Sequence, residues 1–168
     1  MKMDIPKRKP TRLKQHDYNQ NGYYFITICT RNKEKLLCDM VGDGIYDVPS
    51  PMFSPYGRVV ETYIQKMNGY NNRVFVDKYV IMPNHIHLIV VIENGTSQAP
   101  SPTANRANAT LSQFVSLFKR YCHRQCGQPL FQRSFHDHVI RNEADYRKIW
   151  EYIDNNPQKW TLDCFYTP

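Results

Sequence analysis

The chain has 168 residues, 41% of them hydrophobic and 13% aromatic, which suits one globular domain with a buried core. Its longest uninterrupted apolar run, residues 88–92, is far too short to cross a membrane, and the basic N-terminus lacks the apolar segment of a signal peptide. We therefore expect a cytoplasmic protein without a membrane partner. Five scattered cysteines with no CxxC pair favour reduced thiols over disulfides or a zinc knuckle.

The positive charge is concentrated at the N-terminus. The formal net charge is +7, and residues 1–15 carry six basic side chains against the single Asp4. A basic arm over residues 1–20 is typical of segments that follow a nucleic-acid phosphate backbone, although a solvated tail has the same composition. The candidate phosphate contacts in this arm are Lys7, Arg8, Lys9, Arg12 and Lys14.

The first half of the chain reads as strands joined by one helix. A β-branched and aromatic run predicts a strand over 23–30, and the glycines and prolines of 36–55 predict an irregular excursion with a short hairpin around 43–44. Apolar residues at helical spacing predict a helix over 56–67. A strand over 73–82 then turns at 83–84 into an antiparallel strand that starts at residue 85.

The second half begins with a polar linker over 94–110, which contains no core-forming residues. Thr110 or Ser112 caps the next helix, and Gly127 ends it. We predict a strand over 130–140 and a last helix over 142–156, which Pro157 terminates. The helix that ends at Gly127 carries Lys119, Arg120, His123 and Arg124 on the face opposite its apolar stripe.

This order of elements predicts an α+β fold. An antiparallel sheet with helices packed mainly on one face gives a sandwich of the ferredoxin-like or RNA-recognition-like kind. We expect a single domain over 1–168, with its core in 23–160, because neither flank of the linker can bury its apolar faces alone.

The most informative residues are His85 and His87, at the start of the apolar strand. Side chains two residues apart in a strand share a face, and their Cα atoms lie about 6.6 Å apart. Two imidazoles so placed, at the solvent-accessible end of a buried strand, can lean toward one metal ion. The alternative is a pair of polar residues that bond to solvent or to the backbone.

The last helix offers a possible second component of a reaction centre. Its predicted core stripe is Tyr146, Ile149, Trp150 and Ile153. Tyr152 lies off this stripe, and Asn156, four residues later, stacks on the same face as its phenol. Taken alone, the helix favours Tyr152 as an ordinary rim aromatic and Asn156 as a helix-ending residue.

Several separated motifs arrive together in this order. They are Pro-Asn-His-Ile-His-Leu at 83–88, Phe-Gln-Arg at 131–133, His-Val-Ile-Arg-Asn at 138–142, Glu-Tyr-Ile at 151–153 and Asn-Asn-Pro at 155–157. This combination resembles the HUH-type single-tyrosine transposases, with the greatest similarity to their REP-associated tyrosine transposase branch, over roughly residues 23–160.

The resemblance implies a site and a reaction. His85, His87 and Asn156 would bind Mg²⁺ or Mn²⁺, and Tyr152 would be the nucleophile, although many relatives carry Gln at the third ligand position. His138 would be an alternative ligand or a DNA contact, with a buried structural histidine as the other possibility. Ligand chemistry alone also permits zinc.

Such an enzyme cleaves and rejoins single-stranded or hairpin DNA through a 5′-phosphotyrosine link, and would associate with the nucleoid through its DNA. Lys119, Arg120 and Arg124 would hold backbone phosphates together with the arm. We expect a monomer, with a homodimer and action of Tyr152 in cis or in trans left open. The competing hypotheses are a non-catalytic nucleic-acid-binding module of RNA-recognition shape and a metal-dependent hydrolase that uses water.

Overall fold

The computed structural model describes residues 18–42, 49–68, 72–93 and 110–166. The five candidate phosphate contacts of the N-terminal arm and most of the polar linker lie outside this range. The predicted turn of the hairpin at 43–44 also lies outside the described residues.

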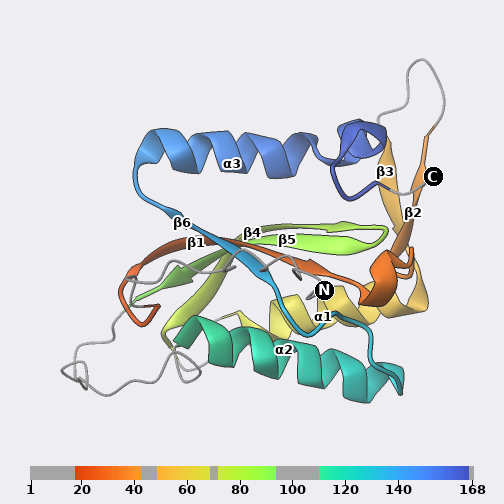
Figure 1. The fold of residues 1–168 in the computed structure, drawn as a ribbon, viewed down its shortest axis with the longest axis horizontal. Helices are drawn as coiled ribbons and strands as arrows, with labels where there is room; N and C mark the ends of the chain where they lie inside the picture. The colour runs from red at the N-terminus through yellow and green to blue at the C-terminus, as the bar shows by residue number, and fades with distance from the viewer. Residues whose placement is uncertain (1–17, 43–48, 69–71, 94–109, 167–168) are drawn as a thin grey trace, which may run out of the picture.

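Four antiparallel strands form the central sheet (Figure 1). They are β1 (Gly22–Cys29), β4 (Val74–Met82), β5 (His85–Ile92) and β6 (His136–Ile140), in the spatial order β4-β5-β1-β6. Pro83 and Asn84 join β4 to β5 in a tight hairpin whose last pair is Met82 and His85. The chain order β1, α1, β4, β5, α2, β6 is that of a ferredoxin-like fold, so the predicted α+β class is confirmed.

Helices cover both faces of this sheet. Helices α1 (Pro55–Met67) and α2 (Thr110–Cys126) lie on one face, and α3 (Glu143–Asn155) lies on the other (Figure 1). Two of the three helices therefore share a face, as expected, and the third covers the opposite side. The Asn142 side chain accepts a hydrogen bond from the Asp145 backbone N–H, which fixes the start of α3.

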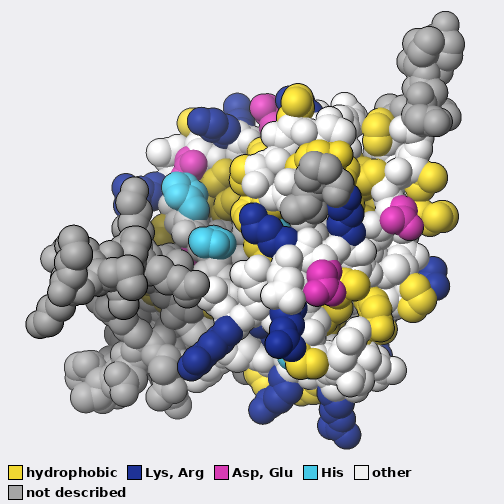
Figure 2. Space-filling model, turned by 45° about the vertical axis from the view of Figure 1, so that its right-hand side comes forward, with side chains coloured by type: hydrophobic (Ala, Val, Ile, Leu, Met, Phe, Trp, Pro, Cys, Tyr) yellow, Lys and Arg dark blue, Asp and Glu magenta, His cyan; other side chains and the backbone are white. Residues whose placement is uncertain are grey.

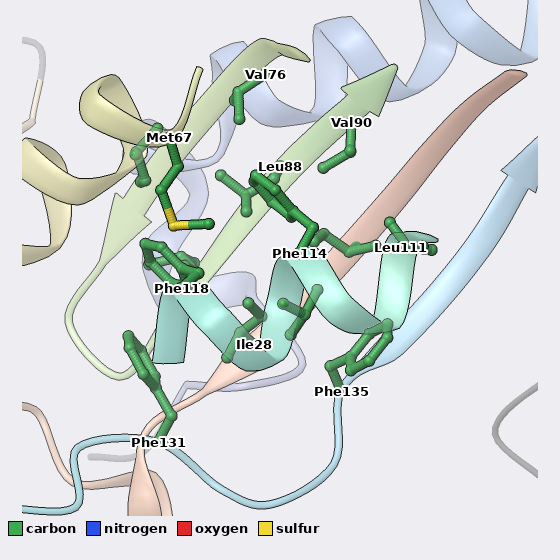
Figure 3. Close-up of a cluster of buried hydrophobic side chains, with 14 of the residues drawn as sticks. Ile28, Met67, Val76, Leu88, Val90, Leu111, Phe114, Phe118, Phe131 and Phe135 are labelled. Carbon is green, nitrogen blue, oxygen red and sulfur yellow. The ribbon is translucent and has the colours of Figure 1, made fainter. Parts of the chain in front are cut away.

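The main core lies between the sheet and helices α1 and α2. Alternate residues of β5, among them Leu88 and Val90, point to this face and meet Phe114 and Phe118 of α2 (Figure 3). Phe118 is fully buried, and its truncation to Ala would cost about 3–5 kcal/mol of stability. The period-2 pattern sends the remaining β5 side chains, including His85 and His87, to the α3 face.

The α3 face holds a smaller apolar cluster. Ile153 is buried there with Ile89 of β5, and Tyr146 and Ile149 pack against the same cluster. Trp150 was predicted in this stripe, and that prediction is wrong: its side chain is 40% exposed. The Lys78 ammonium lies 3.2 Å from the centre of the Trp150 ring and also pairs with Asp154, so Trp150 covers a cation at the rim.

A two-stranded ribbon flanks the sheet, as the predicted hairpin requires. It consists of β2 (Cys38–Val41) and β3 (Ser50–Phe53). Where it meets α1, a Cβ atom at Gly57 would lie 2.0 Å from the Leu37 carbonyl oxygen, so only glycine allows this close approach. Two short 3₁₀ helices complete the described elements, η1 (Arg31–Lys33) and η3 (Pro157–Leu162).

The strand predicted over 130–140 is present only from His136 onward. The segment before it wraps around Lys119, whose ammonium is buried and donates hydrogen bonds to the carbonyls of Gln132, Arg133 and Ser134. Carbonyls that converge on one cation cannot also form a regular ladder. The predicted contact of Lys119 with DNA is therefore wrong, because its charge is used inside the fold.

All five cysteines are free thiols, as expected from their spacing. Within the described ranges, none of the helices has both the length and the apolar content required to cross a bilayer.

Candidate metal and nucleophile site

The two histidines of β5 point toward each other on the α3 face. Their Nε2 atoms lie 3.0 Å apart, and their cross-strand partners on β1 are Cys29 for His85 and Thr27 for His87. Both imidazoles are buried, although a solvent-accessible strand end was expected. The difference arises because the C-terminal segment folds over the strand end, with the Phe165 ring 4.7 Å from that of His85.

Asn84 determines which nitrogen of His85 carries the proton. Its amide nitrogen donates to the carbonyls of Lys33 and Phe165, at 3.3 and 2.8 Å, so its Oδ1 must face the His85 ring. That oxygen lies 2.9 Å from His85 Nδ1 and can only accept. The His85 Nδ1 is therefore protonated in its neutral form, and its Nε2 has a lone pair directed toward His87.

His87 has a partner that permits either tautomer. Its Nδ1 lies 2.8 Å from the Thr27 Oγ1, and a hydroxyl can donate or accept. When Thr27 donates, the His87 Nε2 carries the proton and bonds to His85. When Thr27 accepts, both Nε2 lone pairs point into the space between the rings and become available as ligands.

Burial keeps both imidazoles neutral. Loss of solvation lowers the pKa of His85 to about 4, against a partly opposing effect of the Asp163 carboxylate. The pKa of His87 is lowered well below its usual value, by burial first and by the neighbouring His85 second. Neutral imidazoles are the form in which histidine binds metals.

Tyr152 of α3 reaches the same point. Its hydroxyl lies 3.2 Å from the His87 Nε2 and 3.1 Å from Oδ2 of Asp163, to which it donates. The Phe25 ring of β1 stacks on His87 and meets Tyr152 edge-on, which fixes the position of the phenol. Burial, followed by the charge of Asp163 and its hydrogen bond, raises the pKa of Tyr152 above its usual value, so the phenol is neutral.

Asn156 lies next to Tyr152 and is buried, and its amide is only half satisfied. Its Nδ2 donates to Oδ2 of Asp163 at 2.9 Å, so its Oδ1 faces the other way. This buried oxygen has no hydrogen-bond partner among the described residues. An unsatisfied buried acceptor is costly and is a common mark of a site for a cation or a water.

Asp163 was not predicted from the sequence. It follows η3, and its carboxylate accepts from Tyr152, from Asn156 and from the Phe165 backbone N–H. His85, His87 and Asp163 each offer one possible ligand atom, and these three atoms lie within 4.8 Å of one another. No periodicity or motif marks this position; the only available signal was a carboxylate soon after the Asn-Asn-Pro motif.

These donors fit a divalent cation. Two nitrogens bound to one ion at metal–nitrogen distances of about 2.0–2.1 Å are separated by about 2.9–3.4 Å at tetrahedral or right angles. The observed Nε2 separation of 3.0 Å falls in this range. The Asp163 carboxylate adds an oxygen donor, and a mixed set of nitrogen and oxygen suits Mg²⁺, Mn²⁺ or zinc.

A groove of about 420 Å³ gives access to Tyr152 from the surface. Tyr152, Asn156 and Asp163 line it, together with the exposed Lys148 and Lys159. The groove is therefore open on the side of the phenol, and its two lysines can hold phosphate groups.

The other predicted residues lie away from this cluster. His138 is exposed on the edge strand β6, and its Nε2 bonds to Asp145, so it is neither buried nor directed at the paired histidines. Arg120 and Arg124 are exposed on α2, which covers the opposite face of the sheet. On the face seen in Figure 2, lysine and arginine side chains are scattered rather than gathered in one stripe.

Comparisons with known proteins find relatives over most of the chain. No family model matches the chain. It is 31% identical to an uncharacterized protein of Haemophilus influenzae, over 96% of this chain and 94% of that protein. It is 25% identical to the REP-associated tyrosine transposase of Escherichia coli K12, over 84% of this chain and 70% of that protein.

A solved structure of a REP-associated tyrosine transposase bound to a REP hairpin has the same fold. The TM-score is 0.62 at 22% identity, and the match covers 90% of this chain and 76% of the other. In its fold, in the order of its motifs and, at 25% identity, in its sequence, the chain is similar to the REP-associated tyrosine transposases.

Proposed function

We propose that this protein is a metal-dependent DNA transesterase, a transposase that cleaves and rejoins hairpin-associated single-stranded DNA through a 5′-phosphotyrosine intermediate. The observation that carries the proposal is the position of the Tyr152 hydroxyl, 3.2 Å from the Nε2 of His87, in a side chain that lines a surface groove. The hairpin to which the solved relative is bound supports DNA hairpins as partners.

His85, His87 and Asn156 would hold a divalent ion, Mg²⁺ or Mn²⁺, with Asp163 close enough to contribute. When bound, such an ion neutralises charge that develops on the phosphate and favours the anionic form of a nearby phenol. Asn84 and Thr27 orient the two imidazoles.

In the cleavage step, Tyr152 Oη forms a bond to phosphorus while the bond from phosphorus to the 3′ oxygen breaks. The phenol proton passes to Oδ2 of Asp163, which already accepts it in a hydrogen bond, and the leaving 3′ oxygen takes up a proton. The reverse attack of a 3′-hydroxyl on the phosphotyrosine rejoins a strand. The number of phosphoester bonds is unchanged, so no nucleotide cofactor is required.

Lys148 and Lys159, which line the groove with Tyr152, would position the strand in it. Because α2 lies on the far side of the sheet, Arg120 and Arg124 could contact only a segment of DNA that wraps around the molecule. The basic arm, Lys7 to Lys14, remains a proposed contact with backbone phosphates.

The test is incubation of the protein with end-labelled hairpin DNA that has single-stranded flanks, in Mn²⁺ or in EDTA, followed by a denaturing gel. We expect a band of slower mobility that requires Mn²⁺ and is lost in Tyr152→Phe, which should still bind the DNA. Cleaved DNA without this band would indicate a hydrolase that uses water. Binding that does not depend on metal, without any cleavage, would indicate a binding module.

A further inference from the structure

A second cavity lies on the α3 side of the sheet, where β6 turns into α3. It has a volume of about 460 Å³ and is lined by Tyr23, Ile140, Arg141, Asn142, Glu143 and Tyr146. We call it the β6–α3 pocket. Tyr23 and Ile140 are cross-strand partners and form its floor, and the first turns of α3 form its wall. Nothing in the proposed reaction uses it.

The pocket presents an aromatic surface that is held in place. Tyr23 is 42% exposed, and the Tyr146 ring packs edge-on against it, with 5.5 Å between the ring centres and an angle of 77°. Tyr146 is fixed in turn by a 2.6 Å hydrogen bond from its hydroxyl to Asp77. A half-exposed ring that is supported by a fixed neighbour provides the platform on which an unpaired base stacks.

The charged groups of the pocket favour a nucleotide over an acidic or purely apolar ligand. Over the ranges that the structure describes, the Arg141 guanidinium has no hydrogen-bond or ion-pair partner, so it is available for a phosphate or a base edge. Glu143 is paired with Arg147 one helical turn away, which offsets its negative charge.

The pocket is also within reach of the strand that would be cut. Tyr23 lies two residues from Phe25 on the same face of β1, and Phe25 contacts both His87 and Tyr152. On α3, Tyr146 precedes Tyr152 by six residues, a rise of about 9 Å. A strand whose phosphate meets Tyr152 therefore has a base near the pocket about one to three nucleotides away.

We propose that the β6–α3 pocket binds one unpaired nucleobase of the DNA strand that Tyr152 attacks, with Tyr23 stacked on the base and Arg141 on its edge or on the adjacent phosphate. This proposal rests on the proposed function and extends it. It makes Tyr23 and Arg141 determinants of where along a single strand the protein cuts.

The test measures binding alone, in EDTA, by fluorescence anisotropy of a labelled DNA hairpin with ten-nucleotide single-stranded flanks of mixed sequence. Tyr23→Leu should weaken binding about 5- to 150-fold, the range for loss of one stacked base, and Tyr23→Phe should bind as the wild type does. Tyr63→Ala is the matched control, because Tyr63 lies on α1 and is stacked on Tyr121, on the opposite face of the sheet. Thermal melts should show that all three variants fold.

Replacing each flank nucleotide in turn by an abasic residue provides a second, independent measurement on the wild-type protein. One position should reproduce the loss caused by Tyr23→Leu, and the same abasic DNA should bind Tyr23→Leu with no further loss. Equal binding of intact DNA by wild type and Tyr23→Leu would overturn the pocket assignment. So would a further loss of affinity when Tyr23→Leu is given the abasic DNA. If the pocket assignment is overturned but the wild type still forms its covalent adduct, the proposed function stands. If the wild type binds no DNA, the pocket assignment and the proposed function both fail.

Discussion

The hydroxyl of Tyr152 lies 3.2 Å from the His87 Nε2, although 65 residues separate the two in the chain. This contact joins the helix on one face of the sheet to the buried strand beneath it. The Phe25 ring packs against both groups, stacked on the His87 imidazole and edge-on to the Tyr152 phenol. The fold itself therefore brings together the proposed nucleophile and the proposed metal ligands.

Thr27→Val should weaken metal binding. The substitution keeps the shape of the side chain and removes the hydroxyl that accepts from the His87 Nδ1 when its Nε2 is a ligand. We expect the dissociation constant for Mn²⁺, measured by electron paramagnetic resonance, to rise about 10- to 100-fold, as for other losses of a ligand's supporting hydrogen bond. Thr27→Ser retains the hydroxyl and should bind Mn²⁺ almost as the wild type does. Equal affinity of the Val variant would refute a role for Thr27 in setting the tautomer.

Asp163→Asn separates proton transfer from metal binding. The amide cannot take the proton of Tyr152, so adduct formation should slow about 100-fold or more, the usual range for loss of a general base. Mn²⁺ affinity should change much less, since His85, His87 and Asn156 remain. Asp154→Asn, on the exposed side of α3, is the control. If the affinity falls as far as the rate, Asp163 acts as a metal ligand and not as the proton acceptor.

Stability without metal should fall in acid. Burial lowers the pKa of His85 from 6.5 to about 4 and lowers the pKa of His87 as well. Between pH 6.5 and pH 4 the histidines of the unfolded chain therefore bind protons that the folded chain does not bind. The free energy of unfolding should then fall as the pH falls, by up to about 1.4 kcal/mol per pH unit for each histidine, and should show no contribution from them above pH 6.5. Urea unfolding in EDTA at several pH values measures this slope. His87→Gln should reduce it; an unchanged slope would assign the acid sensitivity to other groups.

Lys119→Met should destabilise the fold without changing the salt dependence of DNA binding. It leaves the three carbonyls of residues 132–134 without their donor, at a cost of about 1–3 kcal/mol. Arg120→Met, at the neighbouring exposed position, should stay within about 0.5 kcal/mol of the wild type. Denaturant unfolding compares the two. A loss of DNA contacts in Lys119→Met with unchanged stability would restore the phosphate-binding role predicted from the sequence.

The sequence predicts the elements that local patterns define. The apolar strand after His85, the capped helix that carries Tyr152, and the tight turn at Pro83 each follow from residue spacing, and together with the resemblance to a known family they indicate the α+β sandwich. The proximity of Tyr152 to the histidines, in contrast, depends on how α3 packs across the sheet, which spacing alone does not define.

The residues that sequence reasoning missed or misplaced act through contacts that residue spacing does not define. Asp163 follows a 3₁₀ helix with no periodic pattern, and its partners come from α3 and the chain end. Lys119 lies on an amphipathic helix, where only the loop at 132–134 reveals that its charge is buried. Trp150 has the spacing of a core residue but covers Lys78 at the rim.

The most direct test of the phosphotyrosine mechanism is identification of the residue joined to DNA. After reaction with hairpin DNA in Mn²⁺, the adduct is digested with nuclease and trypsin and analysed by tandem mass spectrometry. We predict a nucleotide attached through its 5′ phosphate to Tyr152, in the peptide covering residues 149–159. A nucleotide found on any other side chain, or attached through a 3′ phosphate, would contradict the account.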